Sequence, residues 1–228
     1  MDALGHHIQK CAKGGMLIMR HNRIRDLFHD MFVSAKLQAQ MEVPGFYLYE
    51  GPDEGDNKRP DHVVYHFEDH ARGQEPHILL TDVSGTCPVN PGIVQHCANT
   101  AGHAARQVEA GKIRKYPPPD PAYRFQPLVF ETFGHWGAHA VQVVKACAVL
   151  ASQRSISQKD TEAFQRAMWR KLSVAIQKTN WMQYDYAVKQ CFNKRGRGRL
   201  TLNNFMRELQ INVIDYCNRL IEALKRLF

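Results

Sequence analysis

The sequence predicts a mixed α/β protein (α+β) in which a central mixed β-sheet is flanked by helices and followed by further C-terminal helices. Three observations favour this class. Three strand-like segments in a row precede the expected crossover helix, so the chain lacks the regular alternation that builds a doubly wound sheet. One more strand-like segment follows that helix. The last third of the chain then has apolar residues at helical spacing.

The composition is that of a folded domain. The chain has 228 residues, of which 44% are hydrophobic and 23% are charged, and both values are ordinary for a globular protein. They argue against a largely disordered chain, a collagen-like chain and a coiled coil. No apolar run reaches the roughly 18 residues that indicate a membrane-spanning helix. The length suggests one domain, or one and a half.

In the first half of the chain we expect an irregular segment over residues 1–20 and then a helix. Between residues 22 and 37 the apolar side chains recur in steps of three and one, which is typical of an amphipathic helix. Val43-Pro44-Gly45 ends that pattern. Runs rich in aromatic and β-branched residues then predict three strands. They cover residues 46–49, 61–67 and 77–83.

The second half begins with a predicted helix over residues 92–115, which a run of three prolines ends because proline cannot continue a helix. A strand and several helices follow. The strand is expected at residues 125–133, and helices at 138–151 and 159–178. A terminal amphipathic helix is expected as well, because an apolar stripe runs from Phe205 to Leu227.

The charge balance favours a polyanionic partner. Lysine and arginine number 30 against 22 aspartates and glutamates, which gives a formal net charge of +8. Nucleic acid is the first partner to consider for such a chain, and a merely soluble basic surface is the equal alternative. The six cysteines are scattered and form no CxxC pair, so we expect reduced thiols and no structural zinc site made wholly by this chain.

Two aspartates form the strongest chemical signal. Asp61 and Asp82 are 21 positions apart, and a hairpin centred between Ala71 and Arg72 would place them opposite each other. Opposed residues on antiparallel strands have Cβ atoms about 5 Å apart. Two carboxylates at that distance repel unless a cation lies between them, and Mg²⁺ prefers one or two carboxylates with water and phosphate oxygens. The alternative is a pair of unrelated roles in a turn, a cap or a salt bridge.

The helix that follows supplies cations. Glu109, Lys112 and Lys115 follow at steps of three and therefore share one helix face. A lysine placed against the strand ends could orient an attacking water and offset charge on a phosphate. A solvated helix face is the alternative interpretation of the same pattern.

These residues resemble a known family. Pro60-Asp61, Asp82 and a following lysine are similar to the PD-(D/E)xK nuclease pattern. More specifically, residues 5–180 resemble the restriction-enzyme-like endonuclease domain that follows the reverse transcriptase in site-specific non-LTR retrotransposons. The matching stretches are Gly5-His6-His7, Gly14-Gly15, Arg20-His21-Asn22-Arg23-Ile24-Arg25-Asp26, Arg59-Pro60-Asp61, Asp82-Val83, Lys112-Ile113-Arg114-Lys115-Tyr116 and Phe130-Glu131-Thr132-Phe133-Gly134.

The resemblance implies a PD-(D/E)xK restriction-endonuclease-like core and a magnesium-dependent (or manganese-dependent) endonuclease that nicks DNA. Asp61 and Asp82 would bind the metal, and Lys112 or Lys115 would be the catalytic lysine, with Lys115 slightly favoured for its place beside Tyr116. The products would carry a 5′-phosphate and a 3′-hydroxyl. The partners would be DNA and a reverse transcriptase domain in a longer parent protein, with no membrane and a nuclear location.

The chain departs from the family pattern at two places. Ser84 stands where the general nuclease pattern has lysine, so the helix lysine must replace it. His6 and Cys11 have the spacing of half a zinc knuckle, but two ligands do not make a structural zinc site. We therefore expect residues 1–20 to be an irregular segment or knuckle remnant, 21–152 to be the nuclease-like core and 153–228 to be a helical extension.

Several basic residues are candidates for contacting DNA. They are Arg20, His21, Arg59 and, in a glycine-rich basic stretch, Lys194, Arg195, Arg197 and Arg199. His21 could contact the metal site, DNA or merely the local backbone, and Glu131 could be a third acid or the partner of a basic residue. Two other functions fit the same sequence. One is a catalytically inactive nucleic-acid-binding module, and the other is a protein-interaction domain that uses the terminal amphipathic helix.

Overall fold

The computed structural model describes residues 8–10, 13–44, 46, 58–69, 75–118, 120–154 and 160–194. Its helices are α1 (Met16–Ser34), α2 (Val94–Asn99), α3 (His103–Lys115), α4 (Ala138–Gln153) and α5 (Thr161–Lys194), and its strands are β1 (Gln38–Met41), β2 (His62–Phe67), β3 (His77–Thr86) and β4 (Tyr123–Glu131). Two short 3-10 turns precede α1. Residues 1–187 form one compact unit and residues 188–228 a second.

The four strands form one mixed sheet in the order β1-β2-β3-β4. The first three strands are antiparallel neighbours, and β4 is parallel to β3, so the predicted mixed sheet is confirmed. A parallel neighbour requires a crossover, and α2 and α3 supply it. His62 pairs with Thr81, so the midpoint of this pairing in the sequence falls between positions 71 and 72, as the sequence predicted for the hairpin.

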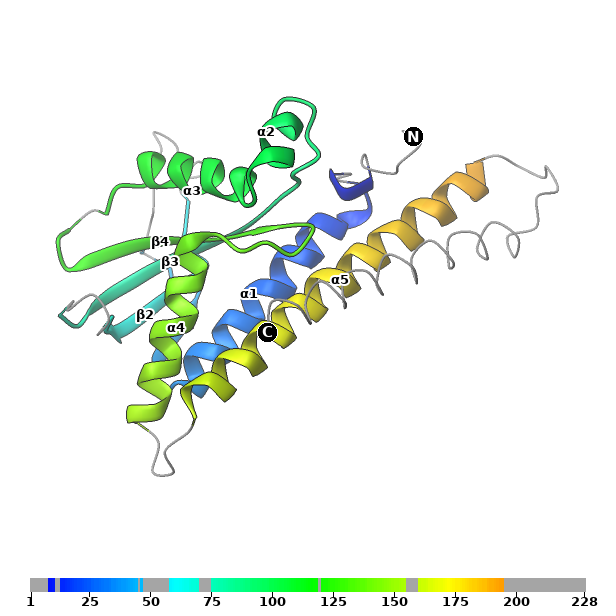
Figure 1. The fold of residues 1–228 in the computed structure, drawn as a ribbon. Helices are drawn as coiled ribbons and strands as arrows, with labels where there is room; N and C mark the ends of the chain where they lie inside the picture. Colours follow the sequence, from blue (N-terminus) through cyan, green and yellow to red (C-terminus); the bar gives the residue numbers. More distant parts are fainter. Residues whose placement is uncertain are drawn as a thin grey trace. The chain divides into compact units, whose positions relative to one another are not determined.

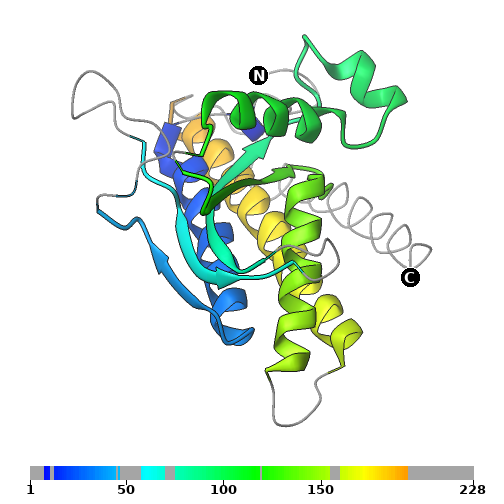
Figure 2. The same ribbon diagram turned by 90° about the vertical axis from the view of Figure 1, so that its left-hand side faces the viewer.

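Helices cover both faces of the sheet (Figures 1 and 2). On one face, α1, α4 and α5 enclose a large apolar core that includes Phe28, Leu128 and Leu172. The α3 face has a much smaller apolar cluster of Val63, Leu80, Tyr116 and Phe125. Neighbouring residues of one strand contribute to different clusters because side chains alternate between the faces of a strand.

Helix α1 begins earlier than the sequence predicted. Residues 16–20 were expected to be irregular, yet they form its first turn and more. The helix starts directly after Gly14 and Gly15, which have φ of 75° and 70°. This left-handed conformation costs little only for glycine, and at Gly14 a Cβ would also collide with the ring of Tyr186. The glycine pair therefore marks the helix start.

Three further elements differ from the prediction. Strand β1 lies where we expected the end of a helix and a break. The expected helix at 92–115 is divided into α2 and α3, because the chain turns at Gly102 with φ of 73°. Helix α5 extends well beyond residue 178, and Met168, Leu172 and Ile176 pack it into the same core as α1 and α4.

Two predicted elements fall on parts of the chain outside the described residues. Most of the strand expected at residues 46–49 and the whole terminal amphipathic segment are in this group. Among the described residues, no helix combines the length and the apolar character needed to cross a membrane.

Candidate active site

Asp61 lies directly before β2, at the end of the β2–β3 ladder, and Asp82 lies on β3. The backbone N–H of Asp61 donates to the carbonyl of Thr81 at 2.8 Å, and Thr81 is also the residue that pairs with His62. The paired register ends with His62 opposite Thr81, so the predicted facing of Asp61 and Asp82 stays a prediction.

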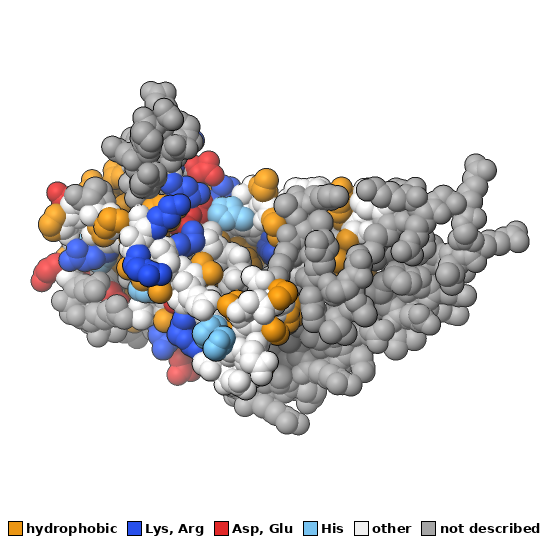
Figure 3. Space-filling view, turned by 90° about the horizontal axis from the view of Figure 1, so that it is seen from above, with side chains coloured by type: hydrophobic (Ala, Val, Ile, Leu, Met, Phe, Trp, Pro, Cys, Tyr) orange, Lys and Arg blue, Asp and Glu red, His pale blue; other side chains and the backbone are white. Residues whose placement is uncertain are grey.

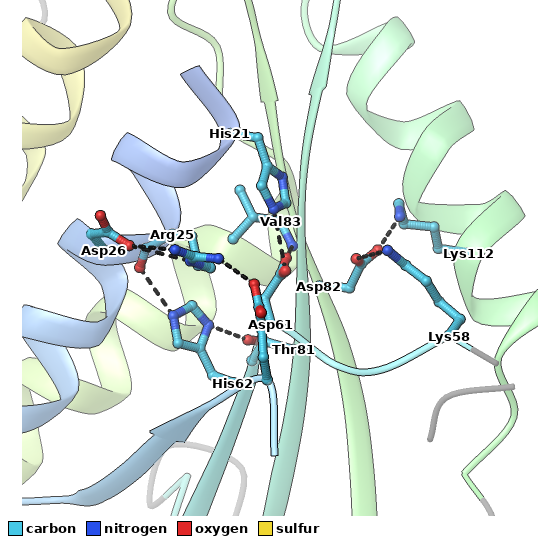
Figure 4. Close-up of polar contacts among 11 residues, drawn as sticks. His21, Arg25, Asp26, Lys58, Asp61, His62, Thr81, Asp82, Val83 and Lys112 are labelled. Carbon is cyan, nitrogen blue, oxygen red and sulfur yellow. Dashed lines mark hydrogen bonds and ion pairs between the residues drawn. The ribbon is translucent and has the colours of Figure 1, made fainter. Parts of the chain in front are cut away.

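The Asp61 carboxylate is buried and held by two donors (Figure 4). One oxygen accepts the backbone N–H of Val83 at 2.6 Å, and the other lies 3.2 Å from His21 Nε2 on α1. Burial by itself would raise the pKa of this carboxyl, but the hydrogen bonds and the charge of His21 outweigh burial, so the pKa of Asp61 lies below its usual value. The same hydrogen bond raises the pKa of His21.

Asp82 is buried on β3, with only 2% of its surface exposed, and two lysines neutralise it. Lys112 Nζ on α3 donates to one carboxylate oxygen, and Lys58 Nζ lies 3.9 Å from the other (Figure 4). The side chain of Lys112 is 19% exposed and that of Lys58 is 48% exposed. The sequence did not indicate a contact between Lys58 and Asp82, because Lys58 was expected to lie in a polar loop.

The structure brings Lys112, and not the slightly favoured Lys115, to the acidic pair. Lys115 is exposed at the C-terminal end of α3, and its amine lies 5.3 Å from the centre of the Tyr116 ring. Lys112 Nζ also lies near this ring, at 5.8 Å, while it pairs with Asp82. A step of three residues rotates a side chain by about 60° around a helix, and this rotation separates the two lysines.

The two carboxylates face different neighbours. In Figure 4 they lie to either side of β3, with Asp61 toward α1 and Asp82 toward α3. A shared ion therefore requires at least one of them to turn from its present partners. Among the described residues, no group of three or more histidine, cysteine, aspartate or glutamate side chains is arranged to hold a metal ion. Two carboxylates still suit Mg²⁺, which takes its remaining oxygens from water and phosphate.

A buried histidine lies next to the first acid. His62, next to Asp61 in the chain, is fully buried, and its ring nitrogens contact Thr81 Oγ1 at 2.7 Å and the carbonyl of Arg25 at 3.0 Å. The carbonyl can only accept, so Nε2 donates and Nδ1 accepts from the threonine hydroxyl. Burial lowers the pKa of His62 to about 4, which keeps the ring neutral. No spacing signal in the sequence pointed to this residue.

The other predicted DNA-contacting residues differ in exposure. Arg59 is exposed beside the site. Arg20 is 4% exposed and donates to Asn180 at 2.9 Å, to Gln183 at 3.1 Å and to the carbonyl of Gln9 at 3.1 Å. We therefore leave Arg20 out of the DNA interface. Lys194 is the last residue of α5, and residues 195–199 lie outside the described residues, as do His6 and Cys11.

Two buried glutamates hold the helices around the site. Glu131, considered above as a third acid, accepts the backbone N–H of Ala105 in the first turn of α3 at 3.0 Å. Glu109 on α3 accepts the N–H groups of Ala138 and His139 at the start of α4. Helix N-termini carry free N–H groups that favour carboxylates. The glutamates therefore fix α3, and with it Lys112, against the sheet.

Basic side chains gather on the α3 side of the molecule. Figure 3, which looks onto this side, shows lysines and arginines clustered over the part of the surface where α3 lies. Arg106, Arg114 and Lys115 are exposed on this helix. The cluster lies on the same side of the sheet as the Asp82–Lys112 pair, so a polyanion bound there would meet the pair.

No protein-family model matches the chain, and no curated protein matches its sequence.

Proposed function

We propose that the protein is a metal-dependent DNA endonuclease that hydrolyses one phosphodiester bond and so nicks its substrate. The observation that carries the proposal is a pair of buried carboxylates beside adjacent strands, Asp61 before β2 and Asp82 on β3, with Lys112 on the second carboxylate. Two acids on adjacent strands and one lysine are the minimal chemistry for phosphodiester hydrolysis, because they supply metal ligands and a cation for the developing charge. The basic surface around α3 is suited to the phosphate backbone.

Each residue of the site has a separate task in this proposal. Lys112 orients the attacking water and offsets negative charge on the scissile phosphate. Lys58, whose half-exposed amine lies 3.9 Å from Asp82, contacts a neighbouring phosphate oxygen. His21 keeps Asp61 ionised and fixes its direction. Asp61 and Asp82 would hold Mg²⁺ or Mn²⁺, which when bound supplies a Lewis acid and lowers the pKa of water.

We further propose that the domain is of the PD-(D/E)xK type found in site-specific non-LTR retrotransposons, where it would act beside a reverse transcriptase. The mixed sheet with antiparallel β2 and β3 is compatible with that core. The placement of Lys112 also supports the proposal. Ser84 replaces the lysine of the general pattern on β3, and the α3 lysine reaches Asp82 instead.

Plasmid nicking tests the function directly. Supercoiled DNA is incubated with Mg²⁺ and the wild type, Asp61→Asn or Asp82→Asn, and conversion to the open circle is followed. We expect each variant to lose activity by at least about 10²-fold, as when a group that stabilises the transition state is removed. Asp30→Asn, at an exposed aspartate on α1, is the matched control and retains activity. Equal nicking by all four proteins would reject the assignment.

One observation favours a second function, a nucleic-acid-binding module without catalysis. Both carboxylates already have partners in the protein, because Asp82 pairs with Lys112 and Lys58 and Asp61 contacts His21, whose pKa its hydrogen bond to Asp61 raises. Such a module binds DNA in a salt-dependent manner with the same affinity in Mg²⁺ and in EDTA. The endonuclease proposal instead predicts DNA-stimulated Mg²⁺ binding that Asp82→Asn abolishes.

A further inference from the structure

Helix α5 is divided lengthwise into a buried half and an exposed half. Its buried positions recur at helical spacing and pack on the core or form buried hydrogen bonds. They are Met168, Leu172, Ala175, Ile176, Thr179, Asn180 and Gln183. Between residues 167 and 182 the opposite side of the helix faces outward, so it contributes nothing to the core that the proposed site rests on.

The outward side has an unusual composition. Its exposed positions between residues 167 and 182 are Ala167, Arg170, Lys171, Val174, Lys178, Trp181 and Met182. This set contains three cations and no acid. Of the acids at the start of the helix, Asp160 and Glu162 pair with Arg166. Asp185, four positions after Trp181, is half-buried. Among the described residues, Arg170, Lys171 and Lys178 form no salt bridge.

Large apolar side chains are interleaved with these cations. Val174 is 59% exposed, Met182 is 39% exposed and Trp181 is 38% exposed. On a helix, residues three or four positions apart are neighbours, so Lys178 lies between Val174 and Trp181 on one surface. A purely solubilising face has no use for a tryptophan among lysines, since exposed aromatic surface is costly in water.

We propose that this outward face of α5 binds single-stranded nucleic acid, with Trp181 stacking on a base and Arg170, Lys171 and Lys178 contacting the phosphates. Aromatic side chains beside cations are how proteins hold unpaired strands without reading sequence. The cations span about 12 Å of helix at 1.5 Å per residue, which is room for a short run of nucleotides. The proposal is independent of the endonuclease site, because it uses none of its residues.

Base stacking selects the single strand over other partners. In a duplex the base planes are covered by their neighbours, so Trp181 would have nothing to stack on. A protein partner would need carboxylates to match three unpaired cations, whereas every nucleotide provides one phosphate and one aromatic plane. A strand freed at a nick is one natural source of such a ligand.

Trp181→Ala tests the stacking contact. Binding of a short oligothymidine to the full chain is measured by fluorescence anisotropy of a labelled strand. We expect Trp181→Ala to weaken binding at least about fivefold, the lower end for loss of one stacked base. Phe133→Ala is the matched control, because Phe133 is also 38% exposed but lies after β4. Equal affinities for the wild type and Trp181→Ala, or an equal loss in the control, would overturn the proposal.

Lys178→Ala tests the phosphate contact through the dependence of affinity on salt. Removing one phosphate contact reduces the slope of log K against log salt by about 0.7 for a single strand. Trp181→Ala should leave this slope unchanged. The control is Lys145→Ala, an exposed lysine on α4. A slope unaffected by Lys178→Ala would contradict the proposal.

Two other occupants of this face give opposite results. If a second copy of the chain covers it, sedimentation shows a dimer that Trp181→Ala dissociates and that oligothymidine does not. If another part of the same chain covers it, acrylamide cannot reach Trp181 in the free protein. The Trp181 fluorescence, obtained as the difference between the wild type and Trp181→Ala, is then not quenched by acrylamide. Either result rejects nucleic acid as the ligand. Loss of nicking in Asp82→Asn affects neither measurement.

Discussion

The two faces of the sheet are packed to very different depths. The face toward α1, α4 and α5 is closed by a large apolar core, in which Phe28, Leu172 and Ile176 have no exposed surface. The face toward α3 has a cluster of only four buried apolar residues, and Lys112 lies near its Tyr116 while it pairs with Asp82. The same strands contribute to both faces, so the difference comes from alternate residues of β2, β3 and β4.

This difference separates stability from chemistry. Apolar burial on the first face holds the strands rigid, and it gains about 25 cal/mol per Å² removed from water. The second face can then carry buried charges, which contribute little to stability even when paired. A ligand approaching the α3 face would meet the Asp82 carboxylate and its lysines on a fixed backbone. Substitutions on the two faces measure how far stability and chemistry are separated.

The largest expected effect is a loss of stability when the large apolar core under α1, α4 and α5 is disrupted. Phe28→Ala should lower the free energy of unfolding by about 3–5 kcal/mol, as for other buried phenylalanines. Phe125→Ala, in the small cluster on the α3 face, should cost roughly half as much because fewer neighbours surround the cavity. Urea denaturation of both variants measures the contrast. Equal losses would show that the two faces share the stability evenly.

The second effect depends on pH. An unfolded histidine takes up a proton near pH 6.5, whereas the buried His62 does so only near pH 4. Between these values the unfolded state binds more protons, so stability falls as the pH is lowered, by about 3 kcal/mol in total. His62→Gln should remove most of this dependence in urea titrations at pH 7 and pH 5. The exposed His66, replaced by asparagine to suit its φ of 51°, is the control and leaves the slope intact.

The third effect separates the two helix lysines. Lys112→Met leaves Asp82 buried with only the distant Lys58, and we expect a loss of about 2 kcal/mol, reduced from a fully buried pair by partial exposure. Lys115→Met should change stability by less than about 0.5 kcal/mol, as for other surface positions. Nicking should follow the same order. Similar losses in both variants would return Lys115 to the site.

The smallest effect concerns the glutamates that link α3 to its neighbours. Glu131→Gln and Glu109→Gln each replace a carboxylate at a helix N-terminus by a neutral acceptor, so each should cost about 1 kcal/mol. Thermal unfolding measures the loss. A pair of variants that unfold like the wild type would show that α3 is held mainly by apolar contacts, and the proposed placement of Lys112 would then need another cause.

The sequence predicted the helices, strands and strand pairing better than the side-chain contacts. The pairing of β2 with β3 followed from the two strand patterns, because register is set once both strands have a buried face. The start of α1 was predicted too late, since the apolar spacing begins only at Ile24, and the helix is set by the glycine pair before it. The crossover helix was predicted unbroken because nothing in its spacing marked the turn at Gly102.

Contacts made at a distance could not be predicted. The bond between the Asp61 carboxylate and the Val83 N–H depends on how one side chain turns at a strand end. The choice of Lys112 depends on the rotation of α3, which is held by the buried Glu109 and Glu131. No pattern around these acids indicated that they accept N–H groups at helix starts. The function and the metal site stay predictions, as does the terminal amphipathic helix.

Arg20 has a consequence for how the protein can be shortened. Its interior positive charge is solvated by amide oxygens of Gln9, Asn180 and Gln183, contributed from both ends of the first compact unit. A chain truncated before residue 180 would strand a guanidinium in an apolar environment, and unpaired interior charge is strongly unfavourable. The smallest autonomous folding unit must therefore keep α5, so enzymatic trimming from the C-terminus should stop short of Asn180.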